Sequence, residues 1–517
     1  MLSRTLGAAL FGIEATLVRV EVHGTQGLPG VSTVGLPDSA VRESRDRVRS
    51  AIMNSNLNYP TLRLTVNLAP ADLRKAGSSL DLPVAVAIAA QDSQLELPPL
   101  QEETLLMGEL SLDGSVRPIP GALSAALEAR SQGISRLMLP AACAREVSVV
   151  PGLRIVPVGS LNETIQALRS EDFTAAAPLV PEDPAALAEL LRTAGGHAVD
   201  MADVRAQPGA RRALEVAAAG GHNLLLMGPP GAGKTMLARR LPTILPPLTL
   251  EEAIEVTRVH SAAGRAAGLG LVTARPFRCP HHTASDVALV GGAGGPAGVR
   301  PGEASLAHHG VLFLDELPEF RRHALESLRQ PLEDGVVTVA RAARTVRFPA
   351  ALTLVAAMNP CPCGHERTRA RECTCTPPMI SRYRSRVSGP LMDRIDLHVE
   401  VPPLTFREMA SEEPGESSGP IRLRVERARE AQRDRQGEFC NARLPSRLMR
   451  RHCRIDAAGR TLLEQAVGRL GLSARGHDRV LRMARTIADL AGEERIERDH
   501  LAEAIQYRGM DRWAPGA

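Results

Sequence analysis

The chain has 517 residues, enough for about three domains of ordinary size, and its formal net charge is +4. Hydrophobic residues make up 44% and charged residues 23%, the balance of a globular protein with true cores, while aromatic residues are only 2%. So few aromatic rings argue against nucleic-acid binding through stacked bases. Of the 62 basic residues two are Lys and the others are Arg, so a single Arg says little and a Lys says more.

Residues 1–165 alternate strand-like and helical segments, which predicts a compact α/β domain. The apolar stretch near the start is interrupted by Glu14 and lacks a small-residue cleavage site, so we read it as a first strand region and not as a signal peptide. The pattern predicts further elements: strands at Leu17–Val22, Leu62–Leu68 and Leu153–Val158, and helices at Ser39–Asn54, Leu82–Gln91 and Ala122–Gln132.

The rest of the chain divides by composition. An Ala-, Pro- and acid-rich stretch at 166–204 predicts a linker, and strands and helices alternate again over 205–407. A polar stretch at 408–420 predicts a flexible loop. The remainder, 421–517, is helical in period and predicts a helical domain with helices at 421–436, 456–470, 473–491 and 498–507.

We expect a cytoplasmic protein without a membrane partner. No apolar run approaches the roughly 20 residues that cross a bilayer. Four of the eight Cys lie within fifteen residues instead of being spread as a disulfide framework, which suits a reducing compartment.

A glycine-rich loop between an apolar strand and a helix is the strongest motif. It follows the pattern GxxxxGK[ST], whose backbone N–H groups surround phosphate oxygens at a helix N-terminus. Lys234 is expected to reach the β- and γ-phosphates of ATP, and the Thr235 hydroxyl to bind Mg²⁺. The expected nucleotide-binding residues of this loop are Gly228, Pro229, Pro230, Gly231, Ala232, Gly233, Lys234 and Thr235.

Two later strands end in polar side chains. An apolar strand ends in Asp315 and Glu316, at the sheet edge where open α/β folds bind ligands. Asp315 is expected to hold Mg²⁺, and Glu316 to act as general base on the attacking water. Asn359 follows a third strand and is expected to orient this water or to contact the γ-phosphate.

Phosphoryl transfer also needs positive charge over the transition state. Arg394, between a helix cap and the last strand of the core, is one candidate. Arg475, which opens a long C-terminal helix, is a candidate to reach the nucleotide from the helical domain, with Arg479 as its rival.

Several stretches together resemble the ComM/YifB family of magnesium-chelatase-like bacterial AAA+ ATPases, over nearly the whole length. They include RPFRCPHHTASDVALVGG (275–292), AAMNPCPCG (356–364) and SGPLMDRIDLHVEV (388–401), and the others lie at 34–52, 301–320 and 473–490. The resemblance implies an AAA+ core with a parallel sheet and a helical lid, ATP hydrolysis and a homohexameric ring. It also implies Arg394 as an arginine finger acting in trans and Arg475 as the lid sensor.

The same resemblance implies a motor on single-stranded or branched DNA, active in recombination during natural transformation. In related ring motors a hairpin before the Asn-terminated strand points into the pore, and here Arg341, Arg344 and Arg347 lie in that hairpin. An exposed hairpin edge in an Arg-rich chain is the alternative reading. Gly291–Pro301 is a candidate second pore loop, and Ile421–Arg460, with 12 Arg against 5 acidic residues, is a candidate phosphate-binding face or a solvated helix surface.

Four cysteines form the pattern CxC-x9-CxC directly after Asn359: Cys361, Cys363, Cys373 and Cys375. Four thiolates suit a structural Zn²⁺ site, although this spacing is tighter than usual. Free thiols and an iron–sulfur cluster are the alternatives. We expect His281–His282 and His308–His309 to be structural or interface groups and not metal ligands.

Residues 60–140 resemble the proteolytic domain of Lon-type proteases. Ser79 stands at the position of the nucleophile, but Ala125 stands at the position of the Lys that activates it, and the chain has no Lys between 76 and 233. Only Lys75 could serve, by an unusual route, so we expect an inactive scaffold or a guide for DNA. The alternatives to a DNA motor are an ATP-driven chelatase or protein remodeller and, less favoured, an ATP-dependent protease.

Overall fold

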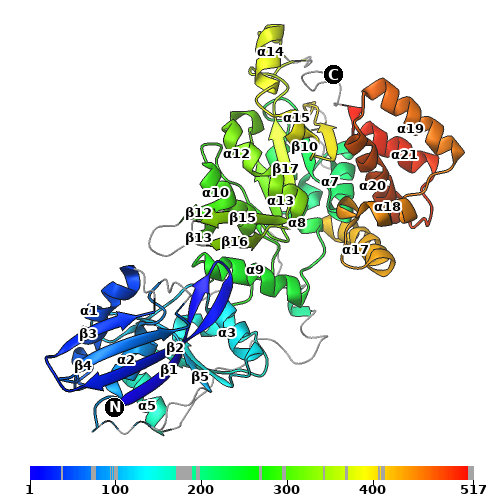
Figure 1. Ribbon diagram of the computed structural model, residues 1–517. Helices are drawn as coiled ribbons and strands as arrows, with labels where there is room; N and C mark the ends of the chain where they lie inside the picture. Colours follow the sequence, from blue (N-terminus) through cyan, green and yellow to red (C-terminus); the bar gives the residue numbers. More distant parts are fainter. Residues whose placement is uncertain are drawn as a thin grey trace.

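We describe the protein from a computed structural model of the full chain. The described residues are 1–35, 39–71, 77–93, 95, 97, 103–170, 189–191, 193, 198–266, 270–293, 299–341, 344–366, 371–405, 408 and 414–509. Figure 1 shows an N-terminal lobe in blue and cyan, a central lobe in green and yellow, and a helical C-terminal lobe in orange and red. The predicted class, α/β lobes followed by a helical region, is confirmed.

The N-terminal lobe is built on a mixed seven-stranded sheet in the order β3-β4-β2-β1-β5-β8-β9. The helix α2 is buried along its whole length because all but one of its side chains are apolar, which places it in the centre of this lobe. The strands are β1 (Leu2–Phe11), β2 (Glu14–Thr25), β3 (Gly30–Val34), β4 (Arg63–Ala69), β5 (Thr104–Leu106), β8 (Arg136–Pro140) and β9 (Arg154–Val158), with a separate pair β6 (Glu109–Leu110) and β7 (Val116–Arg117). The helices are α1 (Ser39–Asn54), α2 (Asp81–Ala89), α3 (Ala122–Ser131), η1 (Ala141–Cys143), α4 (Ala144–Val147) and α5 (Leu161–Ser170).

The central lobe contains a parallel five-stranded sheet in the order β11-β14-β17-β10-β18. Its inner strands are buried on both faces, as the unbroken apolar runs of the sequence require. The strands are β10 (Leu224–Met227), β11 (Phe277–Arg278), β14 (Val311–Leu314), β17 (Thr353–Met358) and β18 (Leu397–Glu400). The helices are η2 (Met201–Asp203), α7 (Pro208–Gly220), α8 (Lys234–Ile244), α9 (Leu250–Ala262), α10 (Asp286–Val290), α11 (Glu303–Leu306), η4 (Leu317–Glu319), α12 (Arg322–Ser327), α13 (Arg329–Asp334), α14 (Pro377–Arg384) and α15 (Gly389–Met392).

Two antiparallel hairpins project from the central lobe. The first pairs β12 (Gly291–Ala293) with β13 (Val299–Pro301), within the stretch predicted as a second pore loop. The second pairs β15 (Val336–Arg341) with β16 (Arg344–Pro349). Both hairpins lie on the chain between α8 and β17, so they are insertions within the nucleotide-binding lobe.

The C-terminal lobe consists of helices that pack into one apolar cluster with the central sheet. They are α17 (Ser418–Gln436), η5 (Asn441–Arg443), α18 (Ser446–His452), α19 (Ala457–Leu470), α20 (Ala474–Ala491) and α21 (Arg498–Gln506). Four of them match the predicted helices within three residues at each end. The short α18 was not predicted, because its seven residues hold three Arg and only two apolar side chains and show no apolar period.

The predicted linker and loop overlap regular structure at their ends. The helix α5 runs to Ser170, four residues inside the expected linker, and α17 begins at Ser418, before the expected loop ends. No helix in the described part of the chain combines the length and the apolar character needed to cross a membrane.

The N-terminal lobe docks on the central lobe through two contacts. In the first, the turn between β1 and β2 meets the hairpin β15–β16. Phe11 and Ile13 pack on the apolar cluster that holds Val346 and Phe348. Gly12 has φ +68, and a Cβ there would lie 2.4 Å from Val346 Cγ1, so this approach requires glycine.

The second contact joins α3 and α4 to α9. Gly121 N donates to the carbonyl and hydroxyl oxygens of Ser261, and Ser261 Oγ donates to Glu146 Oε1 at 3.1 Å. The Glu146 carboxyl is 1% exposed, and burial raises its pKa to about 7. Apolar side chains of both lobes share one cluster around this contact, so the two lobes form a continuous structure.

Gly12→Ala should destabilise the docked arrangement because the added methyl group collides with Val346. Gly152→Ala is the matched control, since Gly152 has φ +77 but no atom lies within 4 Å of its added Cβ. Both variants share the cost of the left-handed backbone. We expect Gly12→Ala to lose a further ~1–3 kcal/mol of unfolding free energy, measured by denaturant titration. Equal losses in the two variants would contradict this account of the contact.

Candidate active site

The glycine-rich loop connects the buried β10 to α8 and is held close to neighbouring strands. A Cβ at Gly228 would lie 2.2 Å from the Val401 carbonyl oxygen, so only glycine fits where the loop leaves the sheet. Gly231 and Gly233 have φ +78 and +88, in the left-handed region. This geometry directs the loop around the first turn of α8, whose free N–H groups form an anion-binding position.

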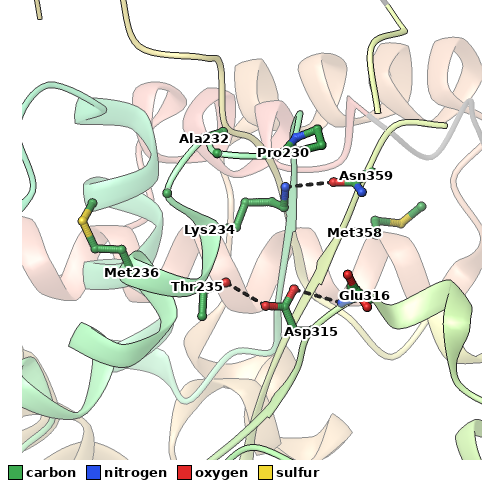
Figure 2. Close-up of a pocket in the computed structure, with 11 residues that line it drawn as sticks. Pro230, Ala232, Lys234, Thr235, Met236, Asp315, Glu316, Met358 and Asn359 are labelled. Atoms are coloured by element: carbon green, nitrogen blue, oxygen red, sulfur yellow. Dashed lines mark hydrogen bonds between the residues drawn. The ribbon is translucent and has the colours of Figure 1, made fainter. Parts of the chain in front are cut away.

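Lys234 lies across this loop. Its Nζ donates to the carbonyl oxygens of Gly228 at 2.7 Å and Pro229 at 2.9 Å, and to Asn359 Oδ1 at 3.1 Å (Figure 2). Burial lowers the pKa of the ammonium, while Asp315 and Glu316 oppose this shift. All three N–H donors are engaged by neutral oxygens that phosphate oxygens can replace.

The acidic pair predicted at the end of β14 lies opposite the loop. Asp315 Oδ2 accepts from Thr235 Oγ1 at 2.7 Å, and Asp315 Oδ1 accepts from the Glu316 backbone N at 2.9 Å (Figure 2). A hydroxyl and a carboxylate side by side are oxygen ligands of the kind that Mg²⁺ prefers. Glu316 has φ +52, and its side chain is 58% exposed, so the carboxylate is accessible at the mouth of the site.

The loop, the acidic pair and Asn359 line one cavity of about 340 Å³. They meet there because β10, β14 and β17 are parallel and their carboxyl ends lie at one sheet edge. Cationic and N–H donors line one side of this cavity and oxygen ligands line the other, which fits a nucleoside triphosphate with its magnesium ion. Gly228 and Pro229 do not line the cavity but supply the carbonyls under Lys234.

The candidate arginines lie outside this cavity. Arg394 is 4% exposed, and its guanidinium donates to the Pro390 carbonyl and to Glu333. The Arg475 side chain is 61% exposed and lies 3.8 Å from the same Glu333 carboxylate. Its rival Arg479 pairs with the buried Asp396 and therefore holds α20 against the central sheet.

Two residues contact the predicted site residues in ways that the sequence did not predict. His282 Nδ1 lies 3.3 Å from Glu316 Oε2, and Glu333 holds both Arg394 and Arg475. Neither follows from spacing, because each partner lies more than thirty residues away along the chain.

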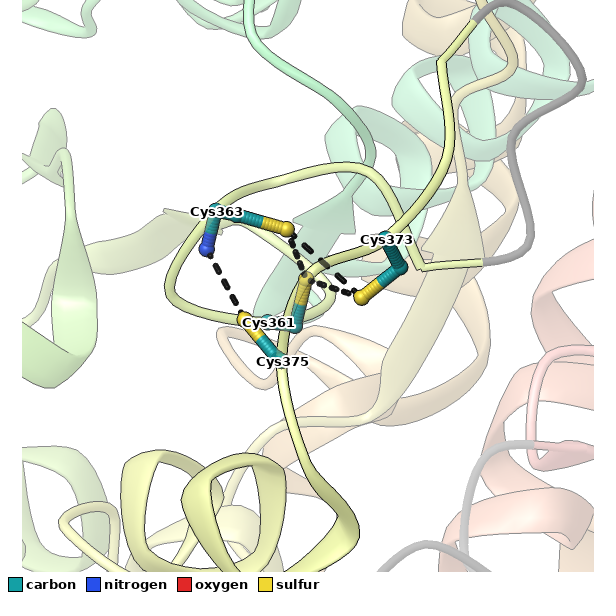
Figure 3. A group of neighbouring side chains, drawn as sticks. All are labelled: Cys361, Cys363, Cys373 and Cys375. Atoms are coloured by element: carbon teal, nitrogen blue, oxygen red, sulfur yellow. Dashed lines mark hydrogen bonds between the residues drawn. The ribbon is translucent and has the colours of Figure 1, made fainter.

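The four predicted cysteines converge on one point (Figure 3). The sulfur of Cys361 lies 3.4 Å from that of Cys363 and 3.7 Å from that of Cys373, and the sulfurs of Cys363 and Cys373 are 3.6 Å apart. All four sulfur atoms, including that of Cys375, lie within 4.8 Å of one another. Four sulfurs at ~2.3 Å from a tetrahedral Zn²⁺ would be roughly 3.8 Å apart, close to these spacings.

The cysteine loop also contacts the nucleotide loop. Gly364 has φ +81, and a Cβ there would lie 2.5 Å from Pro230 Cδ and 3.8 Å from Asn359 Cγ. The conformation of this loop therefore bears directly on the phosphate loop and on Asn359.

A second cluster contains His308, His309 and Glu255. Glu255 Oε2 lies 3.0 Å from His308 Nε2 and 2.8 Å from His309 Nε2. The Ala351 backbone N donates to His308 Nδ1 at 3.0 Å, so the neutral ring carries its proton on Nε2. This nitrogen then donates to the carboxylate and offers no lone pair to a metal, and the cluster links α9 to the central sheet.

The predicted DNA-contacting hairpin has Arg341 and Arg344 as Cα partners at its closed end. The side chains of these two residues lie outside the described part of the structure. Arg347 is exposed and pairs with Thr338, next to the buried pair Val337–Phe348. One face of the hairpin therefore packs inward and the other, with Arg347, faces solvent.

The Lon-like serine has no activating partner among the described residues. Ser79 Oγ is buried and donates to the Ala8 carbonyl at 3.0 Å. Ala125 is fully buried, and Asp81 pairs with Arg47 instead of Ser79. Lys75 lies outside the described residues. The lack of proteolytic activity therefore stays a prediction.

Comparison with known proteins matches three segments to magnesium-chelatase domains. Residues 200–409 match the family described as magnesium chelatase, subunit ChlI, residues 20–143 match subunit ChlI of Mg-chelatase, and residues 415–508 match the ChlI C-terminal domain.

Similarity to known proteins extends over nearly the whole chain. The competence protein ComM of Haemophilus influenzae is 44% identical over 505 residues, which cover 98% of this chain and 97% of ComM. The uncharacterized protein YifB of Escherichia coli is also 44% identical over 505 residues, covering 98% and 96%. A Lon protease of Heliobacterium modesticaldum is 26% identical over 182 residues, which cover 32% of this chain and 22% of that protease. The chain therefore belongs to the magnesium-chelatase-like family of AAA+ ATPases that includes ComM and YifB.

Proposed function

We propose that this protein is an ATP-hydrolysing ring motor that acts on DNA, a branch-migration helicase of recombination during natural transformation. The observation that carries the ATPase part is the meeting of Lys234, Asp315, Glu316 and Asn359 around one cavity. The similarity to a competence protein supports the DNA part. The proposed ring is a homohexamer, and the proposed compartment is the cytoplasm.

The chain's own groups divide the work of hydrolysis. The loop N–H groups and Lys234 bind the phosphates, and Thr235 and Asp315 hold Mg²⁺, which when bound neutralises charge on the phosphate oxygens. Glu316, at the mouth of the cavity, accepts a proton from the attacking water. Asn359, now 3.1 Å from Lys234 Nζ, orients this water through its amide.

Arg394 and Arg475 are proposed to complete the site, Arg394 in the neighbouring subunit's site and Arg475 from the lid. In the single chain both guanidinium groups lie at Glu333, and Arg394 is almost fully buried. On ring assembly and nucleotide binding, the two guanidinium groups must therefore leave the Glu333 carboxylate and bind phosphate oxygens. This replaces one charge-assisted pair by another.

Glu316→Gln should retain ATP binding and lose roughly 10²–10⁴-fold in turnover, because the amide cannot take the proton of the water. Glu319→Gln is the matched control, since Glu319 is an exposed carboxylate three residues away that pairs with Arg386. Nucleotide binding is measured by equilibrium titration and turnover by phosphate release. Hydrolysis near the wild-type rate in Glu316→Gln would show that another group is the base.

The hairpin β15–β16 is proposed to contact DNA phosphates in the pore through Arg341, Arg344 and Arg347. Replacing the three by Ala should leave basal ATP hydrolysis unchanged and abolish its stimulation by forked or single-stranded DNA, because no cationic donor remains on the hairpin. Unchanged stimulation would refute the pore assignment.

A chelatase-type remodeller is the second candidate function, favoured by the family of the three matched domains. Comparing ATP hydrolysis with forked DNA, single-stranded DNA, casein and a magnesium-free porphyrin separates the candidates. Stimulation by porphyrin and not by DNA would replace our proposal, and degradation of casein would support the Lon-type protease.

We also propose that the four-cysteine cluster holds a structural Zn²⁺. Purified protein should contain about one zinc per chain, and Cys373→Ser should lose it, because three thiolates bind the ion less tightly than four. Cys440→Ser, outside the cluster, should retain it. Metal content is measured by plasma emission spectrometry. A wild-type content far below one, or iron in place of zinc, would contradict the assignment.

A further inference from the structure

A run of basic residues in the C-terminal lobe is not used by the ATP site. Between Glu438 and Asp456 the chain has no acidic residue and five Arg. Four of these arginines lie on α18 or two residues after it, and all four are exposed. We call them the α18 arginines: Arg447, Arg450, Arg451 and Arg454.

The local structure places three of the four on one helix face. Arg447, Arg450 and Arg451 are spaced i, i+3 and i+4 on α18, which puts them on one helix face. Met449 and Cys453 are buried on the opposite side and anchor the segment in the lobe. Seven helical residues span ~10 Å, about three phosphate steps of one DNA strand.

The α18 arginines differ in their pairing from several other arginines of this lobe. Arg424 pairs with Glu215 and Glu416, Arg435 and Arg485 pair with Asp489, and Arg479 pairs with Asp396. None of the α18 arginines lies within ion-pair distance of a carboxylate in the described part of the chain. Four uncompensated charges on ordered backbone form a site of strong positive potential.

The last residue of α18, His452, is partly buried and lies among several guanidinium groups. Burial lowers the pKa of His452, and the guanidinium groups of Arg435, Arg451 and Arg485 lower it further, with Asp489 opposing.

The same segment is joined to the hairpin β15–β16. Arg443, four residues before Arg447, donates to the Leu352 carbonyl at 3.2 Å, and a Cβ at Gly335 would lie 2.9 Å from Arg443 Nη1. Gly335 directly precedes β15 and Leu352 directly precedes β17, so α18 is anchored beside the base of the hairpin. Figure 1 shows α18 level with the hairpin.

We propose that the α18 arginines bind the phosphate backbone of DNA, without reading its sequence, as a second contact beside the pore hairpin. This rests on the proposed function, since it takes DNA as the substrate of the motor. Exposed guanidinium groups on a short helix suit phosphates, which need cationic donors and no base-specific pattern. Each phosphate neutralised releases counterions, so the contact must depend on salt.

The test replaces all four α18 arginines by Gln in the full-length protein. A matched control replaces four exposed arginines of the N-terminal lobe by Gln, with the same change in net charge: Arg117, Arg130, Arg145 and Arg169. Binding of labelled forked DNA is measured by fluorescence anisotropy over a series of salt concentrations, together with basal ATP hydrolysis and circular dichroism.

We expect the α18 variant to bind DNA at least ~10-fold more weakly, with a log–log salt slope shallower by about 3. Its basal hydrolysis and its circular dichroism should match the wild type, and the control should bind as the wild type does. An affinity and a slope equal to those of the control would overturn the inference and leave the proposed motor intact. Absence of DNA binding by the wild type would instead overturn the proposed function and this inference with it.

A parallel binding measurement with poly-glutamate tests the alternative of an acidic protein partner. Capture of poly-glutamate by the wild type, lost in the α18 variant while DNA binding is retained, would overturn the proposal in favour of that partner.

Discussion

The close approach of the glycine-rich loop to the parallel sheet is the constraint on which the rest of the site depends. At Gly228 there is no room for a side chain, because the Val401 carbonyl lies where a Cβ would stand. With the loop held there, β10 lies between β17 and β18, and β14 lies beyond β17. The carboxyl ends of these strands bring a cation, two carboxylates and an amide to one cavity with no long loop to order.

The strands that carry the site also carry its connections to the rest of the molecule. The strand β16 leads within four residues into β17, and Asn359 directly follows β17, so the hairpin and the Asn359 amide belong to one continuous segment. The β1–β2 turn packs on Val346 of this hairpin. This contact places the N-terminal lobe where it can restrain the hairpin.

The surroundings of the nucleotide site are held in two different ways. The cysteine loop packs closely against Pro230 at Gly364, and a bound zinc ion would limit the movement of this loop. Glu333, by contrast, holds Arg394 and Arg475 in pairs that ligand oxygens can replace. The cysteine loop is thus packed against the phosphate loop, whereas the pairs at Glu333 join the central lobe to α20.

Local spacing in the sequence was sufficient for the glycine-rich loop, the acidic strand end, the four cysteines and the long helices, because each depends on residues close together in the chain. The tertiary structure alone decided which distant residues meet: His282 at Glu316, Glu333 at two arginines, and Gly364 at Pro230. It also decided that α18 is a helix, because a segment of seven residues with several Arg is too short to show a helical period in the sequence. The physical reason is that periodicity records which face of an element is buried, whereas contacts between elements follow from how those faces pack.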